Sequence, residues 1–108
     1  MRIVMLGTGT YAVPLLAGLY ASKHDVLAVF TRPERKKNKR GVIVSSPMRV
    51  RSNLEGTPVF APDDINVKSS HALFASLEPD LFIVCDYGQI LSPETLSLSP
   101  KGGFNLHA

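Results

Sequence analysis

The stretch RIVMLGTGT, from Arg2 to Thr10, decides the fold class of this chain. Its first half is a near-continuous apolar run, which is typical of a strand covered on both faces of a sheet. The glycines and threonines that follow break the run, and we expect Thr10 to cap a helix that ends near Ser22. A second apolar run, from Asp25 to Thr31, comes next. Strand, helix and strand over about thirty residues make a βαβ unit, so we expect the two strands to pair in parallel.

The same alternation continues along the rest of the chain. The later elements that we expect are a helix over 47–55, a short strand over 57–60, a helix over 68–77 with Ala72, Leu73 and Leu77 facing inward, a strand over 80–86, a helical turn over 93–98 and a last strand after Gly103. This pattern predicts an α/β fold, a Rossmann-like open and mainly parallel sheet with helices on both faces and the strand order 3-2-1-4-5. In such sheets ligands bind beyond the carboxyl ends of the strands, where the first and fourth strands separate. We therefore expect the loops after those strands to meet the end of the last strand at one site.

The composition is that of a single globular domain of 108 residues, with 44% apolar and 19% charged residues. One cysteine, Cys85, excludes an internal disulfide and a cysteine-cluster metal site, and no spacing of His, Asp and Glu indicates a metal site. No apolar run approaches the roughly 20 residues of a membrane span, and the first residues do not form a signal peptide. We therefore expect a cytoplasmic protein without a metal and without a membrane partner.

The net charge of +3 hides a local concentration of positive charge. Residues 32–51 hold eight of the twelve basic residues and one of the nine acidic residues. We call residues 32–40 the basic segment; its cations are Arg32, Arg35, Lys36, Lys37, Lys39 and Arg40. The stretch from Arg32 to about Val44, which contains this segment, has no periodicity and is expected to be a long exposed loop. Such a loop is either a solvated surface or a binding site for the phosphates of a nucleic acid, with salt-sensitive affinity.

Two polar side chains stand close together in the last residues, GGFNLHA. In a strand, Asn105 and His107 would face the same side, and Phe104 and Leu106 would face the other. A neutral amide next to a group that titrates near neutrality suits acyl transfer, in which an oxyanion forms and a proton must move. Taken alone, the two residues are equally compatible with a structural role.

The glycines of the first loop allow a different interpretation. The spacing Gly7-x-Gly9-x-x-Ala12 between a strand and a helix fits a loose dinucleotide-binding fingerprint. The acidic residue that would hold a ribose is missing, because Thr31 and Arg32 stand at the end of the second strand. Arg32 could instead suit a 2′-phosphate, so a non-catalytic NADP-binding module is one alternative. The structural alternative is that the glycines permit a tight turn and close helix packing.

Five short motifs in order resemble the methionyl-tRNA formyltransferases over the whole chain. They are GTxxYAVP from Gly7, TRPxR from Thr31, SPMR from Ser46, YGQIL from Tyr87 and NLHA from Asn105. The resemblance implies transfer of a formyl group from 10-formyltetrahydrofolate to the amino group of methionine on the initiator tRNA. The nearest alternative is a formyltransferase that acts on an amino-sugar nucleotide or on glycinamide ribonucleotide. The long cationic loop disfavours that alternative, because a small acceptor does not need it.

The resemblance also implies a role for each matching residue. Asn105 would donate a hydrogen bond to the formyl oxygen as it becomes an oxyanion, and His107 would assist proton transfer. Tyr11 would lie beside the methionyl side chain. The residues implied to cradle the pterin ring are Tyr87, Gly88, Gln89, Ile90 and Leu91. Those implied to approach the tRNA are Arg32, Arg35, Lys36, Lys37, Lys39 and Arg40.

The resemblance further implies that residues 1–108 form only the N-terminal part of the formyltransferase catalytic domain. A later catalytic Asp and a C-terminal tRNA-binding domain of that family are not in this sequence. We expect such a fragment to be inactive alone, and able to self-associate through its last strand, whereas a full-length enzyme is expected to be a monomer. Two positions depart from the family's pattern: Gly9 stands where proline is usual, and Asp86 stands where a small apolar residue is usual.

Overall fold

Five parallel strands form one sheet in the order β3-β2-β1-β4-β5. The computed structural model describes residues 1–34 and 39–106. The strands are β1 (Arg2–Leu6), β2 (Asp25–Phe30), β3 (Val59–Phe60), β4 (Leu81–Cys85) and β5 (Gly103–Leu106). The Rossmann-like fold class and the strand order predicted from the sequence are therefore confirmed.

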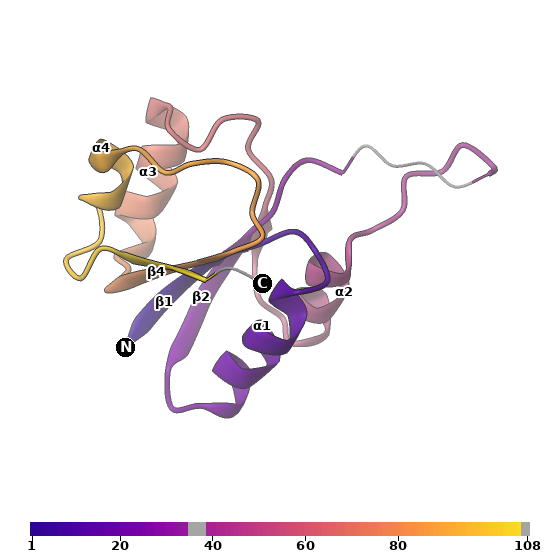
Figure 1. Ribbon diagram of the computed structural model, residues 1–108, viewed down its shortest axis with the longest axis horizontal. Coiled ribbons are helices and arrows are strands. Elements are labelled where there is room, and N and C mark those ends of the chain that lie inside the picture. Colours follow the sequence, from indigo (N-terminus) through magenta and orange to yellow (C-terminus); the bar gives the residue numbers. More distant parts are fainter. Residues whose placement is uncertain (35–38, 107–108) are drawn as a thin grey trace.

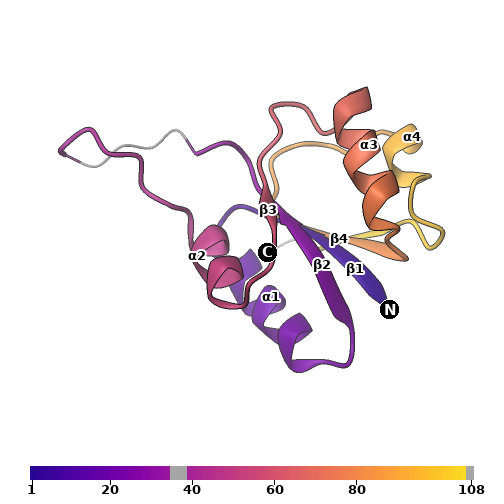
Figure 2. The same cartoon turned by 180° about the vertical axis from the view of Figure 1, so that it is seen from behind.

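Helices cover both faces of this sheet (Figures 1 and 2). The helices are α1 (Ala12–Ala21), α2 (Pro47–Leu54), α3 (Lys68–Leu77) and the single turn α4 (Pro93–Leu96). α1 and α2 lie on one side of the sheet, and α3 and α4 lie on the other (Figure 1). Ser46 caps α2 by accepting a hydrogen bond from the Arg49 amide at 3.2 Å, as one of the two serines was expected to do.

The two faces of the sheet bury two separate apolar clusters. Along β1, Ile3 and Met5 pack with α1 and α2, whereas Val4 and Leu6 pack with α3. β4 alternates in the same way, and all five of its residues are buried. Because both faces are covered, consecutive positions are apolar in the central strands, over Ile3–Leu6 of β1 and throughout β4, rather than every second one.

Three local expectations were wrong. Thr10 does not cap α1; the N-cap is Tyr11, without a side-chain hydrogen bond, because a turn bonded from the Ala12 amide to the Gly9 carbonyl precedes the helix. Ala72 is exposed, and Phe74 is the residue of α3 that is buried, since its ring packs between those of Phe30 and Phe82. β3 is only two residues long, because it is an edge strand that follows Pro58, which has no amide hydrogen for a ladder.

Candidate functional site

Thr8 joins the three loops that leave the carboxyl ends of β1, β2 and β4. Its hydroxyl donates to the Tyr87 carbonyl at 3.1 Å and accepts from the Arg32 amide at 3.0 Å. The amides of Thr8 and Gly9 both donate to the Asp86 carbonyl, at 2.9 and 3.3 Å. The sequence-based expectation that the loops after the first and fourth strands meet at one site is therefore correct, and the loop after β2 joins them.

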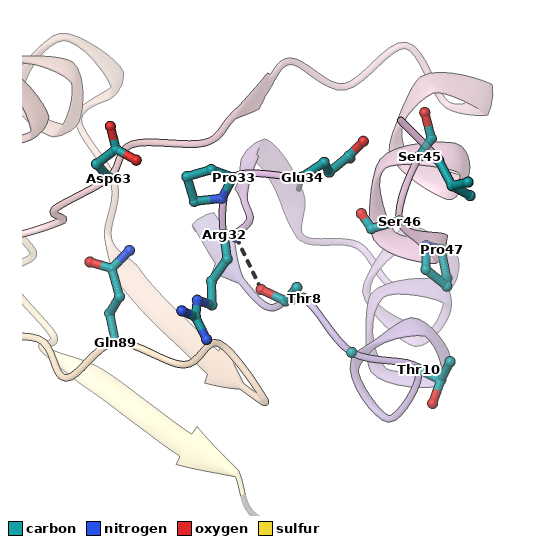
Figure 3. A pocket seen from close by; sticks show the side chains of 12 residues that line it. Thr8, Thr10, Arg32, Pro33, Glu34, Ser45, Ser46, Pro47, Asp63 and Gln89 are labelled. Atoms are coloured by element: carbon teal, nitrogen blue, oxygen red, sulfur yellow. Dashed lines mark hydrogen bonds between the residues drawn. The ribbon is translucent and has the colours of Figure 1, made fainter. Parts of the chain in front are cut away.

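A cavity of about 670 Å³ opens beside these loops (Figure 3). It lies between the β1–α1 loop, the start of the basic segment and the first residues of α2. The lining residues are Thr8, Gly9, Thr10, Arg32, Pro33, Glu34, Val44, Ser45, Ser46, Pro47, Asp63 and Gln89. Of the residues expected to contact substrate, Arg32 and Gln89 line it. Ser45, Ser46 and Asp63 were not predicted to contact a ligand. Ser46 opens the SPMR motif, but a motif does not show which of its side chains reach a cavity.

Arg32 contributes a guanidinium to this cavity, the larger of two. Its side chain points between Thr8 and Gln89 (Figure 3), and in the described part of the chain it has no acidic partner. Two carboxylates also line the cavity, those of Glu34 and Asp63, and that of Glu34 is paired with Arg49 at 2.7 Å. The cavity therefore offers a guanidinium and several hydroxyl groups, which suits a ligand with an anionic part and hydrogen-bonding groups.

Gly88 makes room for that guanidinium. A Cβ on Gly88 would lie 2.5 Å from the Arg32 Cδ, and the backbone φ of 94° is one that side chains disfavour. The glycine of the predicted pterin-binding loop is thus required by both its conformation and its neighbour, and a larger residue there would displace Arg32 from the cavity.

The loop between β4 and α4 presents only part of the predicted pterin-binding set. Ile90 is 89% exposed, Gly88 is exposed and Gln89 is half-buried, whereas Tyr87 and Leu91 are buried in the core beneath the loop. Gln89 is held at both ends of its amide, because Oε1 accepts from the Ile65 amide at 2.8 Å and Nε2 donates to the Pro62 carbonyl at 3.3 Å.

Asn105 lies at a second, smaller cavity of about 140 Å³. Its lining residues are Val84, Gln89, Ile90, Leu91, Leu96, Gly103, Phe104 and Asn105. Asn105 is the register partner of Val84, so β5 brings the predicted catalytic amide beside the predicted pterin-binding loop. Gln89 lines both cavities and lies between them. The other predicted catalytic residue, His107, is outside the described residues, and its pairing with Asn105 stays a prediction.

Comparisons with known proteins show which family this chain belongs to. The family model described as formyl transferase matches residues 1–108, the whole chain. This chain belongs to the formyl transferase family. It is 37% identical over 108 residues to the methionyl-tRNA formyltransferase of Alkaliphilus metalliredigens, covering 100% of this chain and 34% of that protein. For the protein of the same name from Methylococcus capsulatus, the identity is 39%, with 100% and 35% covered. The chain thus spans about a third of the length of these relatives.

The two departures from the family's pattern occupy one place in this formyl transferase structure. A Cβ on Gly9 would overlap the Asp86 carboxylate, so the space of a side chain at position 9 is taken by the side chain at position 86. Gly9 has no positive φ; space and not conformation requires the glycine. The carboxylate also fills the place where a dinucleotide pyrophosphate would approach the second glycine of its fingerprint, and its charge would repel that group. The structure therefore argues against the NADP-binding alternative.

The two described ends of the basic segment differ: residues 32–34 line the larger cavity, whereas residues 39–40 lie away from the sheet (Figure 1). Lys39 and Arg40 are exposed, and the chain around them lies far from the helices (Figure 1). Arg35, Lys36 and Lys37 are outside the described residues. Tyr11, the predicted neighbour of a methionyl side chain, is 69% exposed, and it follows the cavity residue Thr10 without lining the cavity itself.

Within residues 1–34 and 39–106, no helix has the length and apolar character of a membrane span. The same residues contain no group of three or more His, Cys, Asp or Glu side chains that could hold a metal ion. Cys85 is buried in β4. Burial, and to a lesser extent the neighbouring Asp86 carboxylate, raises the pKa of its thiol.

The buried Tyr87 side chain predicts a pH effect on stability. Burial, the largest cause, raises the pKa of Tyr87 to about 12, while Arg32 lowers it and Asp64 raises it. Among the described residues its hydroxyl has no hydrogen-bond partner. The unfolded chain loses this proton near pH 10, before the folded chain does, so the contribution of Tyr87 to stability is lost as the pH rises from about 10 towards 12.

At pH 8, the free energy of unfolding of Tyr87→Phe is therefore expected to lie within about 1 kcal/mol of that of the unmodified chain, because the substitution removes a buried hydroxyl without a partner among the described residues. Above pH 10 the variant should become progressively more stable than the unmodified chain. Urea denaturation at pH 8 and pH 11 measures both differences, and Tyr11→Phe, at an exposed tyrosine, is the matched control. A difference that does not change with pH would contradict the assignment of a raised pKa.

Proposed function

We propose that this chain forms the N-terminal part of the catalytic domain of a methionyl-tRNA formyltransferase. The observation that carries the proposal is the similarity of the whole chain to proteins of that name, at 37% and 39% identity. The reaction would move a formyl group from 10-formyltetrahydrofolate to the amino group of methionine on the initiator tRNA. The acceptor amine attacks the formyl carbon, the formyl oxygen becomes an oxyanion, and the folate nitrogen departs after taking up a proton.

We assign the formyl donor to the smaller cavity. It is lined by the exposed Ile90, by Gln89 and by Asn105, which together offer an apolar surface and amide groups to a flat heteroaromatic ring. The Asn105 amide would donate to the developing oxyanion, which is the kind of stabilisation that contributes most in acyl transfer. His107, two positions further along the chain, would carry the proton between the attacking amine and the folate nitrogen.

We assign the acceptor end of the aminoacylated tRNA to the larger cavity. Arg32 can bind a phosphate, whereas Ser45 and Ser46 can bind the hydroxyl and amine groups of an aminoacylated nucleotide. The basic segment, including Arg35, Lys36, Lys37, Lys39 and Arg40, would follow the tRNA backbone through phosphate contacts, which position a nucleic acid without reading its sequence. Gln89 lies between the two cavities, where donor and acceptor would have to meet.

Folate binding by the 108-residue chain tests this proposal. We expect calorimetric titration with 5-formyltetrahydrofolate, a stable formyl folate, to show binding, and titration with NADPH to show none. Ile90→Asp should weaken folate binding about tenfold or more, because it places a charge on the apolar wall of the smaller cavity, and tenfold corresponds to about 1.4 kcal/mol.

Leu54→Asp is the matched control. Leu54 has the same size as Ile90 and is 77% exposed, but it lies on α2, away from the smaller cavity. Tight binding of NADPH without binding of the folate would overturn the proposal. Equal effects of the two aspartate substitutions would show that the folate binds elsewhere.

A further inference from the structure

The predicted pterin-binding loop is held in place by a segment that no motif marks. Two side-chain amides reach in opposite directions across the gap between residues 62–66 and residues 89–92. Gln89 reaches from the loop to the backbone of Pro62 and Ile65, as described above. Asn66 reaches from the segment to the backbone of the loop, where its Nδ2 donates to the Ile90 carbonyl at 2.9 Å and its Oδ1 accepts from the Ser92 amide at 2.9 Å.

The loop needs such contacts, because its backbone is irregular. Residues 86–92 belong to no helix or strand, and Asp86 and Gly88 have positive φ angles of 52° and 94°. Backbone groups in an irregular loop cannot satisfy one another through a regular ladder, so side chains or water must satisfy them, and only side chains also fix the loop in place. Asn66 holds a carbonyl and an amide of this loop at the same time.

The hydrogen-bond partners fix the orientation of the Asn66 amide. If Oδ1 and Nδ2 were exchanged, Nδ2 would face the Ser92 amide, which is also a donor, and Oδ1 would face the Ile90 carbonyl, which is also an acceptor. Oδ1 also accepts from the Thr95 hydroxyl at 2.7 Å. All three contacts agree with one orientation, and all three bind the loop or the first turn of α4.

The position of the Thr95 proton then fixes the direction of the next contact. The single hydroxyl hydrogen of Thr95 is used on Asn66, so the His71 Nε2, 2.7 Å from the Thr95 oxygen, must carry a hydrogen and donate it. The Ser92 hydroxyl, at 3.0 Å, can donate to the second lone pair of the same oxygen. A directed series of hydrogen bonds therefore runs from His71 on α3 through Thr95 and Asn66 to the loop.

We propose that Asn66 is a positioning residue of the folate subsite, which fixes the Ile90 carbonyl and the Ser92 amide so that the loop is preorganised for the formyl donor. This inference rests on the proposed function, because it assigns that ligand to this loop. Asn66 does not contact the reacting atoms; it acts through the loop backbone. Preorganisation of this kind improves affinity by removing the cost of ordering a loop during binding.

Two substitutions separate the contacts of Asn66. Asn66→Ala removes all three, whereas Asn66→Asp keeps the acceptors for Ser92 and Thr95 and loses only the donor to Ile90. We expect the Ala variant to bind 5-formyltetrahydrofolate at least about tenfold more weakly than the unmodified chain, with the Asp variant weakened as well. In the Ala variant, without ligand, hydrogen exchange of the Ser92 amide should be at least about tenfold faster, while exchange in β1 stays unchanged. The Asp variant should keep the Ser92 amide protected.

Asn53→Ala is the matched control, an exposed asparagine on α2 at the opposite face of the sheet. Unchanged exchange at Ser92 in Asn66→Ala would overturn the inference, and so would unchanged folate affinity in both Asn66 variants when the unmodified chain binds. Absence of folate binding by the unmodified chain would instead overturn the proposed function, and with it the ligand assigned to the loop. Should Asn66→Ala fail to fold, the folate affinities of the Asp variant and of Thr95→Val, which removes one acceptor contact of Asn66, answer the same question. Unchanged affinity in both would overturn the inference.

Discussion

Gly7→Ala is expected to lower the free energy of unfolding by about 3 kcal/mol or more, at the upper end of the overpacking range. A Cβ on Gly7 would lie 2.7 Å from the Cβ of Ala12 and 2.7 Å from the carbonyl oxygen of Cys85. Neither neighbour can turn aside, because one is fixed on α1 and the other belongs to the backbone of β4. The helix and the central strand would have to separate, and a chain of this size has only about 5–15 kcal/mol of stability.

Gly18→Ala is the matched control for this substitution. Gly18 lies within α1, and a Cβ there would meet no atom within 4 Å. Since alanine favours helix formation over glycine by about 1 kcal/mol, this variant should be as stable as the unmodified chain or more stable. Urea denaturation followed by circular dichroism measures both. If the free energy of unfolding of Gly7→Ala were within about 0.5 kcal/mol of that of the unmodified chain, α1 would pack less closely on β4 than it does in the structure.

Phe74→Ala is expected to lower the free energy of unfolding by about 3–5 kcal/mol, which is the usual range for truncating a buried phenylalanine. The Phe74 side chain has no exposed surface, and its ring centroid lies 4.7 Å from that of Phe30 and 4.9 Å from that of Phe82. The substitution would leave a cavity between α3 and two strands of the sheet. α3 has no side-chain cap at its N-terminus, so the helix depends on tertiary packing, and Phe74 is its one buried apolar residue.

The same urea measurement checks this prediction, with Leu54→Ala as the control at a large apolar residue that is 77% exposed. The control should change the free energy of unfolding by no more than about 0.5 kcal/mol. If the two variants lost similar amounts of stability, α3 would not be packed through Phe74. Because α3 also carries His71, which donates to Thr95, a loss of this packing should loosen the loop that Asn66 holds.

The candidate site could be predicted only as far as backbone topology carries it. Loops that follow parallel strands must emerge at the same edge of a sheet, so the meeting of the loops after β1 and β4 needed no side-chain information. Thr8 and Asn66 could not be predicted, because their partners are 24 to 79 positions away along the chain. The buried side chain of Tyr87 was equally hidden, since the motif around it does not say which of its residues point into the core.

The sequence by itself determined the fold class, the strand order and the strongly basic stretch. Those features depend on local periodicity and on the handedness of crossover connections, which each stretch of chain expresses on its own. Only the tertiary structure decided that Asp86 occupies the space above Gly9, that Arg32 lies against Gly88, and that an asparagine from a distant turn holds the β4–α4 loop. These are contacts between residues far apart in the chain. Close packing in three dimensions determines which of them form, and no local pattern in the sequence encodes that packing.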